Sequence, residues 1–155
     1  MSEVVIDRFS RSRLLFGEDF TKLQSAKILI CGCGGVGGAA IEALYRSGAV
    51  NLSVIDCDRF EITNQNRQLG SECLGELKCE VFARKFKGVT PIAARIDEEF
   101  LSEFNLAQFD FVIDAIDDVG AKIALELRCS EAGVGFVSSM GGAKRLDPAK
   151  IEIRS

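Results

Sequence analysis

The stretch Ala26-Lys27-Ile28-Leu29-Ile30-Cys31-Gly32-Cys33-Gly34-Gly35-Val36-Gly37 decides the fold. It begins with a short apolar run, typical of a buried strand, and passes directly into glycines at the spacing Gly-x-Gly-x-x-Gly. Residues 36–47 then place apolar side chains at helical spacing. A strand, a glycine turn and a helix in this order favour a phosphate-binding loop, because glycines let an anion approach the free N–H groups at the positive end of a helix.

The remainder of the chain alternates in the same way. Further strands are expected at residues 51–56, 91–96, 109–115 and 135–139, and further helices at residues 77–86, 97–106 and 119–132. This alternation predicts an α/β fold with a Rossmann-like, doubly wound and mostly parallel sheet. Residues 1–25 are expected to form a helical N-terminal arm, which leaves residues 26–155 as the nucleotide-binding domain. Residues 151–154 are expected to add an edge strand at most.

The composition excludes several classes of protein. The chain has 155 residues, with 19 Lys and Arg against 23 Asp and Glu, a net charge of −4 and no His. This length suits one domain, and the absence of His excludes a Ser-His-Asp triad, a Cys-His dyad and a His-ligated metal within this chain. The polar start lacks the apolar segment of a secretory signal, and no apolar run is long enough to span a membrane. A cytoplasmic location is therefore expected.

Six cysteines occur, and none forms a Cys-x-x-Cys pair, so a structural zinc site is not expected. In a chain without a secretory signal, we interpret them as reduced thiols that serve mostly as small buried hydrophobic residues. A redox or sulfur-handling role is the alternative, and nothing in their spacing supports it. The six are Cys31, Cys33, Cys57, Cys73, Cys79 and Cys129.

Polar residues gather beyond the second expected strand. Asp56 ends that strand about 20 residues after the glycine loop, where an acid can hydrogen-bond a ribose hydroxyl. A long connection follows, with Asp58, the run Asn64-Gln65-Asn66-Arg67-Gln68 and then Lys78. An arginine and a lysine beside phosphates can stabilise a phosphoryl-centred transition state. Ordinary surface charge is the alternative for Arg67 and Lys78.

A second polar stretch, Asp114-Ala115-Ile116-Asp117-Asp118, follows the fourth expected strand. Because ligands of open α/β sheets bind at the carboxyl ends of the strands, these acids are expected to face the same crevice as the glycine loop. Two or three carboxylates beside phosphates indicate a Mg²⁺ site. The alternative for Asp117 and Asp118 is the N-cap of the next helix.

Taken together, these motifs resemble the ThiF/MoeB/ubiquitin-activating (E1-like) superfamily, whose members adenylate carboxylates with MgATP. The resemblance rests on residues 32–37, Asp56, the run at residues 64–68, Lys78 and Ile113-Asp114-Ala115-Ile116-Asp117. Two further stretches are similar to the tRNA threonylcarbamoyladenosine dehydratase branch. They are Arg13-Leu14-Leu15-Phe16-Gly17 and Ser139-Met140-Gly141-Gly142-Ala143-Lys144-Arg145-Leu146-Asp147-Pro148. The family runs on beyond the position that matches Ser155, so the resemblance implies an adenylation fold truncated at its C-terminus.

The resemblance also implies roles for individual residues. The positions that cradle the ATP phosphates match Gly34, Gly35 and Gly37. Asp56 matches the acid that binds the ribose, and Asp117 matches the acid that holds Mg²⁺ and is needed for adenylation. The other nucleotide-binding positions match Asp58, Asn64, Arg67, Gln68 and Lys78, with Arg67 and Lys78 as catalytic residues near the phosphates. Arg13 matches an arginine that can reach the ATP of a neighbouring subunit, which implies a homodimer.

The implied activity is an ATP-dependent dehydration of N6-threonylcarbamoyladenosine in tRNA through adenylation of its carboxylate. The leading alternative is an adenylyltransferase that activates the C-terminus of a ubiquitin-like sulfur-carrier protein, as MoeB and ThiF do. Two further hypotheses are an NAD-dependent oxidoreductase and a non-catalytic nucleotide-binding module. A tRNA partner requires a local basic patch in this acidic chain, from Arg8, Arg11 and Arg13 or from Lys144, Arg145 and Lys150.

Overall fold

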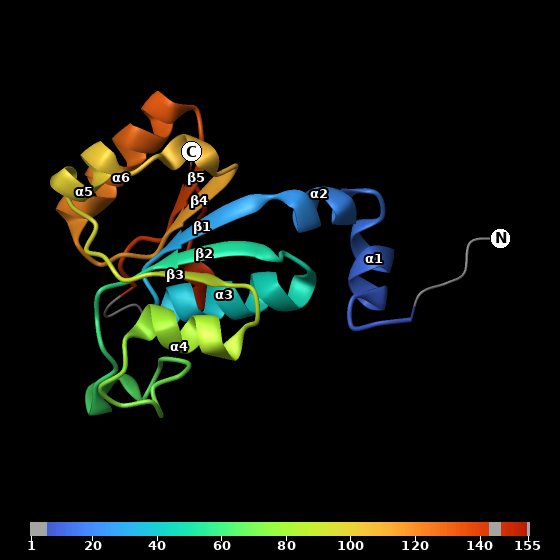
Figure 1. Ribbon diagram of the computed structural model, residues 1–155, viewed down its shortest axis with the longest axis horizontal. Coiled ribbons are helices and arrows are strands. Elements are labelled where there is room, and N and C mark those ends of the chain that lie inside the picture. Colours follow the sequence, from blue (N-terminus) through green and yellow to red (C-terminus); the bar gives the residue numbers. More distant parts are fainter. Residues whose placement is uncertain (1–5, 143–146, 155) are drawn as a thin grey trace.

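In the computed structural model, which describes residues 6–142 and 147–154, five strands form one parallel sheet (Figure 1). The strands are β1 (Lys27–Cys31), β2 (Asn51–Ile55), β3 (Thr90–Ile92), β4 (Phe111–Asp114) and β5 (Gly135–Ser138). They lie in the order β3-β2-β1-β4-β5, and every neighbouring pair is parallel. The order changes direction between β1 and β4, so the carboxyl ends of these two strands form the topological switch point. The doubly wound α/β fold is confirmed.

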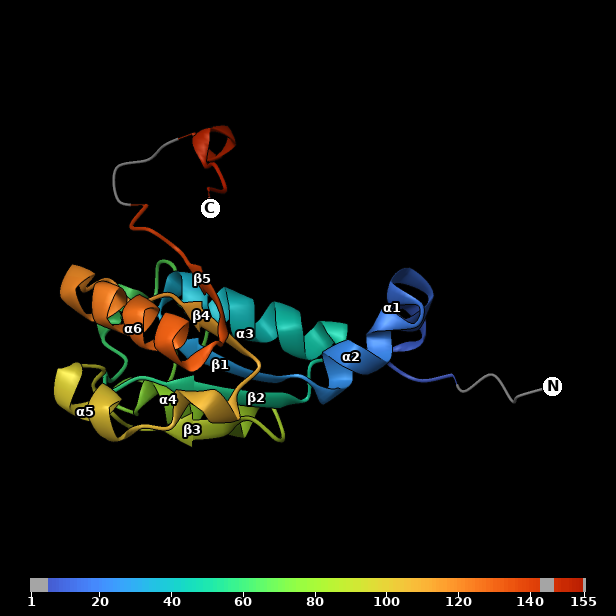
Figure 2. The ribbon, with the colours of Figure 1, turned by 90° about the horizontal axis from the view of Figure 1, so that it is seen from above.

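Four helices cover the two faces of the sheet. Helices α3 (Gly35–Ser47) and α4 (Lys78–Lys85) lie on one face, and α5 (Glu98–Glu103) and α6 (Val119–Ala132) lie on the other (Figures 1 and 2). Single 3-10 turns occur in the connections, at η1 (Ile62–Asn64), η2 (Leu106–Gln108) and η3 (Pro148–Lys150). Within residues 6–142 and 147–154, no helix has the length and apolar character needed to cross a membrane.

The central strand supplies side chains to two separate cores. Ile28 and Ile30 of β1 pack on the side of α3 and α4, whereas Leu29 and Cys31 pack on the side of α5 and α6. A parallel strand that is covered on both faces has apolar residues at consecutive positions. Residues 28–31 are all apolar, as this position in the sheet requires.

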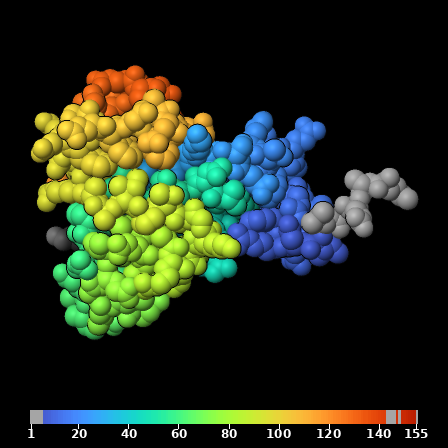
Figure 3. Space-filling view, viewed as in Figure 1, coloured from blue at the N-terminus to red at the C-terminus, as the bar shows by residue number. Residues whose placement is uncertain are grey.

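The N-terminal arm consists of two short helices, α1 (Ser10–Phe16) and α2 (Asp19–Ser25), and projects beyond the body of the protein (Figure 3). Phe20 is its buried anchor. Gly48 leaves room for this ring, because a Cβ there would lie 2.5 Å from Phe20 Cε2. The guanidinium of Arg8 lies 4.5 Å from the ring centre of Tyr45 on α3. The arm therefore packs at the amino end of β1, at the far end of the sheet from the glycine loop (Figure 1).

Two of the expected strands differ in the structure. Strand β3 ends at Ile92 rather than at residue 96, because the N–H of Ala94 donates to the carbonyl of Ile92 at 3.1 Å and turns the chain out of the sheet. Ile96 is then buried in the core beside α5 and α6. Residues 151–154 form no strand, and Ile153 is fully exposed. An alternating pattern without a neighbouring strand to pair with is insufficient to form an edge.

Helix α3 packs against the end of β1 with no space for a side chain between them. A Cβ at Gly37 would lie 1.8 Å from the carbonyl oxygen of Gly32. Gly32 itself has a φ of 95°, and a Cβ there would lie 2.8 Å from the carbonyl oxygen of Ala115. By contrast, a Cβ at Gly35 would meet no atom closer than 3.5 Å. The first and last glycines of the motif therefore serve close packing, and the inner glycines leave the loop open.

We expect Gly37→Ala to destabilise the fold by about 3 kcal/mol or more, because a methyl group against the Gly32 carbonyl forces α3 away from β1. Gly35→Ala is the matched control in the same loop, and it should change the free energy of unfolding by less than about 1 kcal/mol. Urea unfolding followed by circular dichroism measures both variants. Equal stability of the two variants would contradict the packing role of Gly37.

Candidate active site

The glycine loop places the N-terminus of α3 at the carboxyl edge of the sheet. The helix begins at Gly35 after the N-cap residue Gly34, and no side chain among the described residues caps it. The N–H groups of its first turn are therefore open to an outside acceptor, and the helix dipole makes this end positive. This geometry suits a phosphate bound at Gly34, Gly35 and Gly37.

Asp56 follows β2 and links the glycine loop to the end of that strand through hydrogen bonds. Its Oδ2 accepts from the N–H of Cys33 at 2.6 Å, and its Oδ1 accepts from the N–H of Asp58 at 2.7 Å. Partial burial raises the pKa of the Asp56 carboxyl, and the two N–H donors oppose that rise. Each carboxylate oxygen keeps a lone pair, so Asp56 can still accept a hydrogen bond from a ribose hydroxyl.

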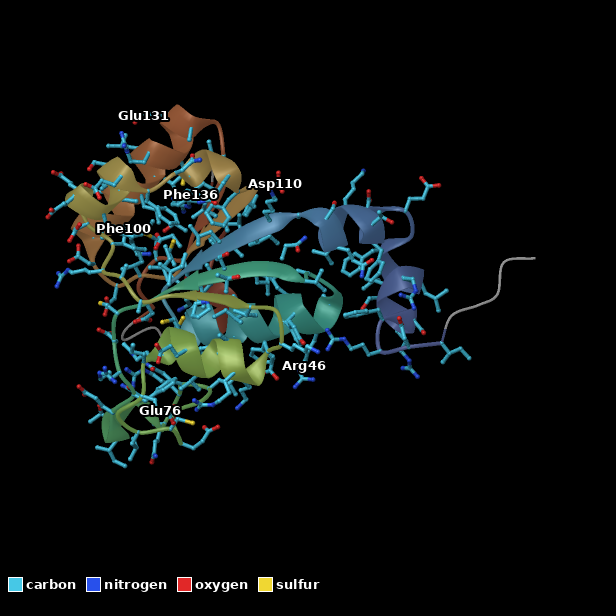
Figure 4. All side chains as sticks on the ribbon, in the orientation of Figure 1. Arg46, Glu76, Phe100, Asp110, Glu131 and Phe136 are labelled. Carbon is cyan, nitrogen blue, oxygen red and sulfur yellow. The ribbon has the colours of Figure 1, made fainter. Side chains whose placement is uncertain are left out.

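The connection between β2 and α4 is closed at its base. Arg59 and Leu77 form an antiparallel bridge, and the N–H of Phe60 donates to the carbonyl of Glu76 at 3.0 Å. The buried ring of Phe60 anchors the connection in the core beside α3 and α4. Figure 4 shows Glu76 on this connection, beyond α4. A loop that is closed and anchored in this way holds its polar residues in place without regular secondary structure.

The middle of this connection lies against the glycine loop. A Cβ built at Gly34 would lie 3.7 Å from Nε2 of Gln68, and one built at Gly35 would lie 3.5 Å from the carbonyl oxygen of Arg67. The structure therefore brings Arg67 and Gln68 of the predicted run beside two of the predicted phosphate-binding glycines.

Asn64 organises this segment from a buried position. Its Oδ1 accepts from the N–H of Glu61 at 3.0 Å, and its carbonyl accepts from the N–H of Arg67 at 3.1 Å. The guanidinium of Arg67 is folded back on the segment, where it donates to the Thr63 carbonyl at 3.1 Å and to Oδ1 of Asn66 at 2.9 Å. In this arrangement the Arg67 side chain is exposed and points to its own loop.

Gln68 carries a polar atom that lacks a partner. The residue is 9% exposed, and its buried Oε1 accepts no hydrogen bond from the described residues. Leaving a buried acceptor unpaired costs about 1–3 kcal/mol of folding stability. A buried acceptor of this kind therefore indicates a role other than stability. The other amide atom, Nε2, is the one that lies beside Gly34.

Lys78 and Asp58 are brought together at the same edge. Lys78 is the first residue of α4, is buried, and places Nζ 3.3 Å from Oδ2 of Asp58. The carboxylate and thiol donors of Asp56, Cys57 and Asp58 lie within 4.8 Å of one another. Because Lys78 and backbone N–H groups already engage the two carboxylates, this group is a paired set of charges rather than a free acidic cluster.

The three acids after β4 have three different environments. Asp114 is completely buried and pairs with Nζ of Lys122 at 2.8 Å, so the expectation that it faces the crevice was wrong. Asp118 caps α6 by accepting from the N–H of Ala121 at 2.9 Å, which was the alternative interpretation. Asp117 is exposed and makes no hydrogen bond or ion pair within the described ranges. Of the three, Asp117 is the carboxylate that no described residue engages.

Arg13 lies on α1, at the opposite end of β1 from the glycine loop (Figure 1). Its guanidinium pairs with Asp7 and lies 5.5 Å from the ring centre of Phe20. The structure therefore does not bring Arg13 together with the other predicted site residues of the same chain. Residues 143–146 of the stretch expected to mark the branch lie outside the described residues.

Lys122 was not predicted from the sequence, although a signal is present. Helix α6 buries Ala121, Leu125 and Cys129, and Lys122 lies on the same inward stripe. A lysine on an inward stripe indicates a buried ion pair, but its partner Asp114 can be identified only once the fold is known.

The cysteines mostly behave as buried hydrophobic residues. All six are free, and four of them are buried. Burial raises the pKa of the Cys129 thiol to about 11 and also raises the pKa of Cys33. Thiols with raised pKa values stay protonated near neutral pH and are poor nucleophiles. The buried set consists of Cys31, Cys33, Cys79 and Cys129.

Comparison with known proteins gives consistent results. The sequence matches the ThiF family over residues 9–144. It is similar to the tRNA threonylcarbamoyladenosine dehydratase of Haemophilus influenzae, with 36% identity, covering 91% of this chain and 57% of that protein. The crystal structure of the E. coli tRNA N6-threonylcarbamoyladenosine dehydratase in complex with ATP matches with a TM-score of 0.89 and 32% identity, covering 96% of this chain and 67% of that chain.

A second kind of relative also matches. The molybdopterin-synthase adenylyltransferase of Haemophilus influenzae is 33% identical, and the match covers 90% of this chain and 61% of that protein. The chain spans between 57% and 62% of the length of the curated dehydratases that it matches.

We expect Cys57 to be alkylated first by iodoacetamide in the folded protein, and the four buried cysteines to be alkylated only on unfolding. Burial, Asp58 and Asp56 raise the pKa of Cys57, so its rate should still increase as the pH passes the usual thiol value of 9.0. Mass spectrometry of tryptic peptides after timed labelling measures each site. Rapid labelling of Cys33 or Cys129 in the folded protein would contradict their structural role.

Proposed function

The chain belongs to the ThiF family, and from this membership we propose that it binds ATP at the glycine loop and uses it to adenylate a carboxylate. The proposed carboxylate is that of N6-threonylcarbamoyladenosine in tRNA. Three similar relatives bear the name of the corresponding dehydratase, at 34–36% identity. The ATP bound to the E. coli relative supports the choice of nucleotide.

The observation that carries this proposal is the packing of the connection after β2 onto the glycine loop. A site built only for a dinucleotide needs the glycines and an acid such as Asp56. Here Arg67 and Gln68 also lie beside the glycines, and Lys78 begins the next helix at the same edge. Cationic groups in this place suit a reaction centred on phosphorus.

The proposed reaction has two steps. A carboxylate oxygen of the nucleoside attacks the α-phosphorus of ATP, the bond to the bridging oxygen breaks, and pyrophosphate leaves. A nucleophilic group of the same nucleoside then attacks the activated carbonyl carbon, and AMP leaves with the former carboxylate oxygen while a proton passes to solvent. The nucleoside has then lost one water, and ATP has become AMP and pyrophosphate. The ring closure needs no nucleophile from the protein.

Arg67 and Lys78 are proposed to offset the charge that develops at the α-phosphate. Arg67 would exchange the acceptors on Thr63 and Asn66 for phosphate oxygens, and Lys78 would extend from Asp58 toward the same oxygens. Hydrogen bonds between a cation and a phosphate are roughly twice as strong as neutral ones. Asn64 holds this segment in place, and Asp56 is proposed to bind the ribose.

Asp117 is proposed to hold Mg²⁺. Its exposed carboxylate follows β4 at the switch point, two residues after Ala115, whose carbonyl lies against Gly32 of the glycine loop. This ion is usually held by one or two carboxylates together with substrate phosphates and water, so an exposed aspartate at this edge fits it. When bound, Mg²⁺ supplies positive charge that stabilises the phosphate oxygens.

We propose a homodimer in which Arg13 acts on the nucleotide of the partner subunit. Its place at the far end of β1 makes a role at the glycine loop of its own chain geometrically unfavourable. Leu14 and Leu15 of the same helix are 86% and 78% exposed, which gives α1 an apolar face that a second copy would cover.

A basic depression is proposed to contact the tRNA. It has a volume of about 410 Å³. One of its lining residues, Arg46, lies at the end of α3 near α1 (Figure 4). Glu42, Glu76 and Glu72 pair with three of its cations, and Lys87 pairs with no acid within the described ranges. Cations interleaved with aromatic rings suit an RNA backbone and its bases. The lining consists of Arg8, Tyr45, Arg46, Arg84, Lys85, Phe86 and Lys87.

Adenylation of a sulfur-carrier protein is the second candidate, because the molybdopterin-synthase adenylyltransferase is also similar to this chain. The same glycine loop, Arg67, Lys78 and Asp117 would serve it. The two functions differ in the carboxylate that is adenylated, which belongs to a tRNA nucleoside in one and to a protein C-terminus in the other. Identifying the substrate therefore distinguishes them.

The decisive experiment is mass spectrometry of tRNA nucleosides after incubation of the protein with MgATP and tRNA that contains N6-threonylcarbamoyladenosine. Loss of one water from that nucleoside, with an equal amount of AMP, is the expected result. An unchanged nucleoside together with pyrophosphate exchange that depends on a sulfur-carrier protein would favour the second candidate. Binding of ATP without either reaction would contradict both and leave a nucleotide-binding module.

Asp117→Ala is expected to lower the rate of ATP-dependent turnover at least about 100-fold, since the variant loses the carboxylate proposed for Mg²⁺. Its melting temperature should stay within about 2 °C of wild type, because Asp117 is exposed and unpaired. Glu126→Gln, at an exposed position of α6, is the control and should keep full activity. Undiminished activity of Asp117→Ala would remove Asp117 from the proposed role.

The double variant Arg46→Gln/Lys87→Gln is expected to weaken tRNA binding while leaving ATP affinity unchanged. If both cations contact phosphates, the slope of log K against log salt concentration should become shallower by about two. Filter binding over a range of salt concentrations measures the slope. Lys22→Gln/Lys27→Gln, two exposed lysines that do not line the depression, is the control with equal change in charge. Identical slopes for the two double variants would rule out this surface.

A further inference from the structure

A buried ion pair joins β4, α6 and β5 at the carboxyl edge of the sheet. Lys122 is 6% exposed, and Asp114, the last residue of β4, is 0% exposed. Nζ of Lys122 lies 2.8 Å from Oδ2 of Asp114, 2.8 Å from the carbonyl oxygen of Ser139 and 3.3 Å from Oγ of Ser138. An ammonium group has three N–H donors, so all three are used.

Asp114 also fixes the turn that leads to Asp117. Its Oδ1 accepts from the N–H of Ile116 at 2.9 Å, one residue before Asp117. Its Oδ2 accepts from Oγ of Ser138 at 2.6 Å in addition to Lys122. One carboxylate therefore connects the turn after β4 to the end of β5.

The same turn is in contact with the glycine loop. The N–H of Ala115 donates to the carbonyl of Cys31 at 2.8 Å, and the carbonyl of Ala115 is the group that a Cβ at Gly32 would meet at 2.8 Å. Residues 115–117 are thus held between the ion pair on one side and the glycine loop on the other. A shift of the ion pair would move this turn relative to the loop.

Stability alone does not account for charged residues at these two positions. Both groups lose their hydration on burial, and well-packed apolar residues of similar size commonly give equal or greater stability. What an ion pair provides is a fixed geometry, because each donor and acceptor has one satisfactory arrangement. The segments that it fixes are distant in the sequence and meet only at this edge.

We propose that Lys122 is a positioning residue of the adenylation site. Through Asp114 it sets the place of the turn that carries Asp117, and through the carbonyl of Ser139 it sets the start of residues 139–142 on the same edge. This inference rests on the proposed function, because the place of Asp117 beside the phosphates is what the pair maintains. Lys122 and Asp114 are themselves buried and fully paired, so they act through these two segments.

The test uses the double variant Asp114→Asn/Lys122→Met, which removes the ion pair without leaving one buried charge unpaired. Lys22→Met/Asp19→Asn, which removes an exposed ion pair on α2, is the matched control. Hydrogen exchange of the ligand-free proteins reports the backbone directly. The N–H groups of Ile116 and Ser139, which both donate to Asp114, should exchange at least about tenfold faster in the double variant and remain unchanged in the control.

Kinetics supplies the second readout. In tRNA-dependent turnover, the double variant should lose about tenfold in kcat, keep its KM for ATP within about threefold, and need more Mg²⁺ for half-maximal rate. When added to Asp117→Ala, the same change should cost less than a further twofold, because both act on one carboxylate. A purely structural role would instead lower the amount of folded enzyme and leave the Mg²⁺ requirement unchanged.

The outcomes separate this inference from the proposed function. Unchanged hydrogen exchange at residues 116 and 139 would overturn the positioning role, whatever the activity. A double variant with wild-type kcat and an unaltered Mg²⁺ requirement would also overturn it while leaving the proposed function intact. A wild-type protein that never converts the nucleoside would overturn the proposed function itself, and the role that rests on it.

Discussion

The structure depends on the contact between the Gly37 Cα and the Gly32 carbonyl, where no side chain fits. This contact sets the N-terminus of α3 directly over the end of β1. Two other segments pack against the glycine loop that this contact fixes. The chain after β4 touches Gly32 through the carbonyl of Ala115, and the connection after β2 covers Gly34 and Gly35. The glycine loop that this approach fixes is therefore the common contact of both segments.

The connection after β2 shows how a loop can hold charged groups at a fixed place. Its ends are joined at Arg59 and Leu77, and Phe60 is buried beneath it. The polar side chains between these points gain their order from the loop rather than from a helix or strand. The Arg67 guanidinium is already hydrogen-bonded to that loop, so the proposed contact with phosphate would replace existing hydrogen bonds rather than order a free side chain. The entropy lost on binding is reduced accordingly.

Local patterns predicted most of the fold, and contacts between distant segments explain the rest. The glycine loop, the parallel sheet and the bounds of α6 follow from periodicity and turn chemistry within short windows. The acids after β4 could not be separated in the same way. Asp118 caps a helix through Ala121, a local contact, but Asp114 is defined by Ser138, which lies 24 residues away. The predicted strand at residues 91–96 failed for a similar reason, since the turn at Ala94 leads Ile96 to another layer.

The difference between Asp114 and Asp117 has an electrostatic consequence for the site. Two free carboxylates at the switch point would both repel a triphosphate, and this repulsion would be strongest in a partly buried crevice. Lys122 neutralises Asp114 within the protein, so its charge is cancelled before any nucleotide binds. Among the described residues, neither Asp117 nor the helix-capping Asp118 has a cationic partner, and the cation proposed for Asp117 would offset this charge together with that of the phosphates. The buried lysine therefore lets Asp114 fix the geometry of the turn without adding a free negative charge beside the proposed nucleotide site.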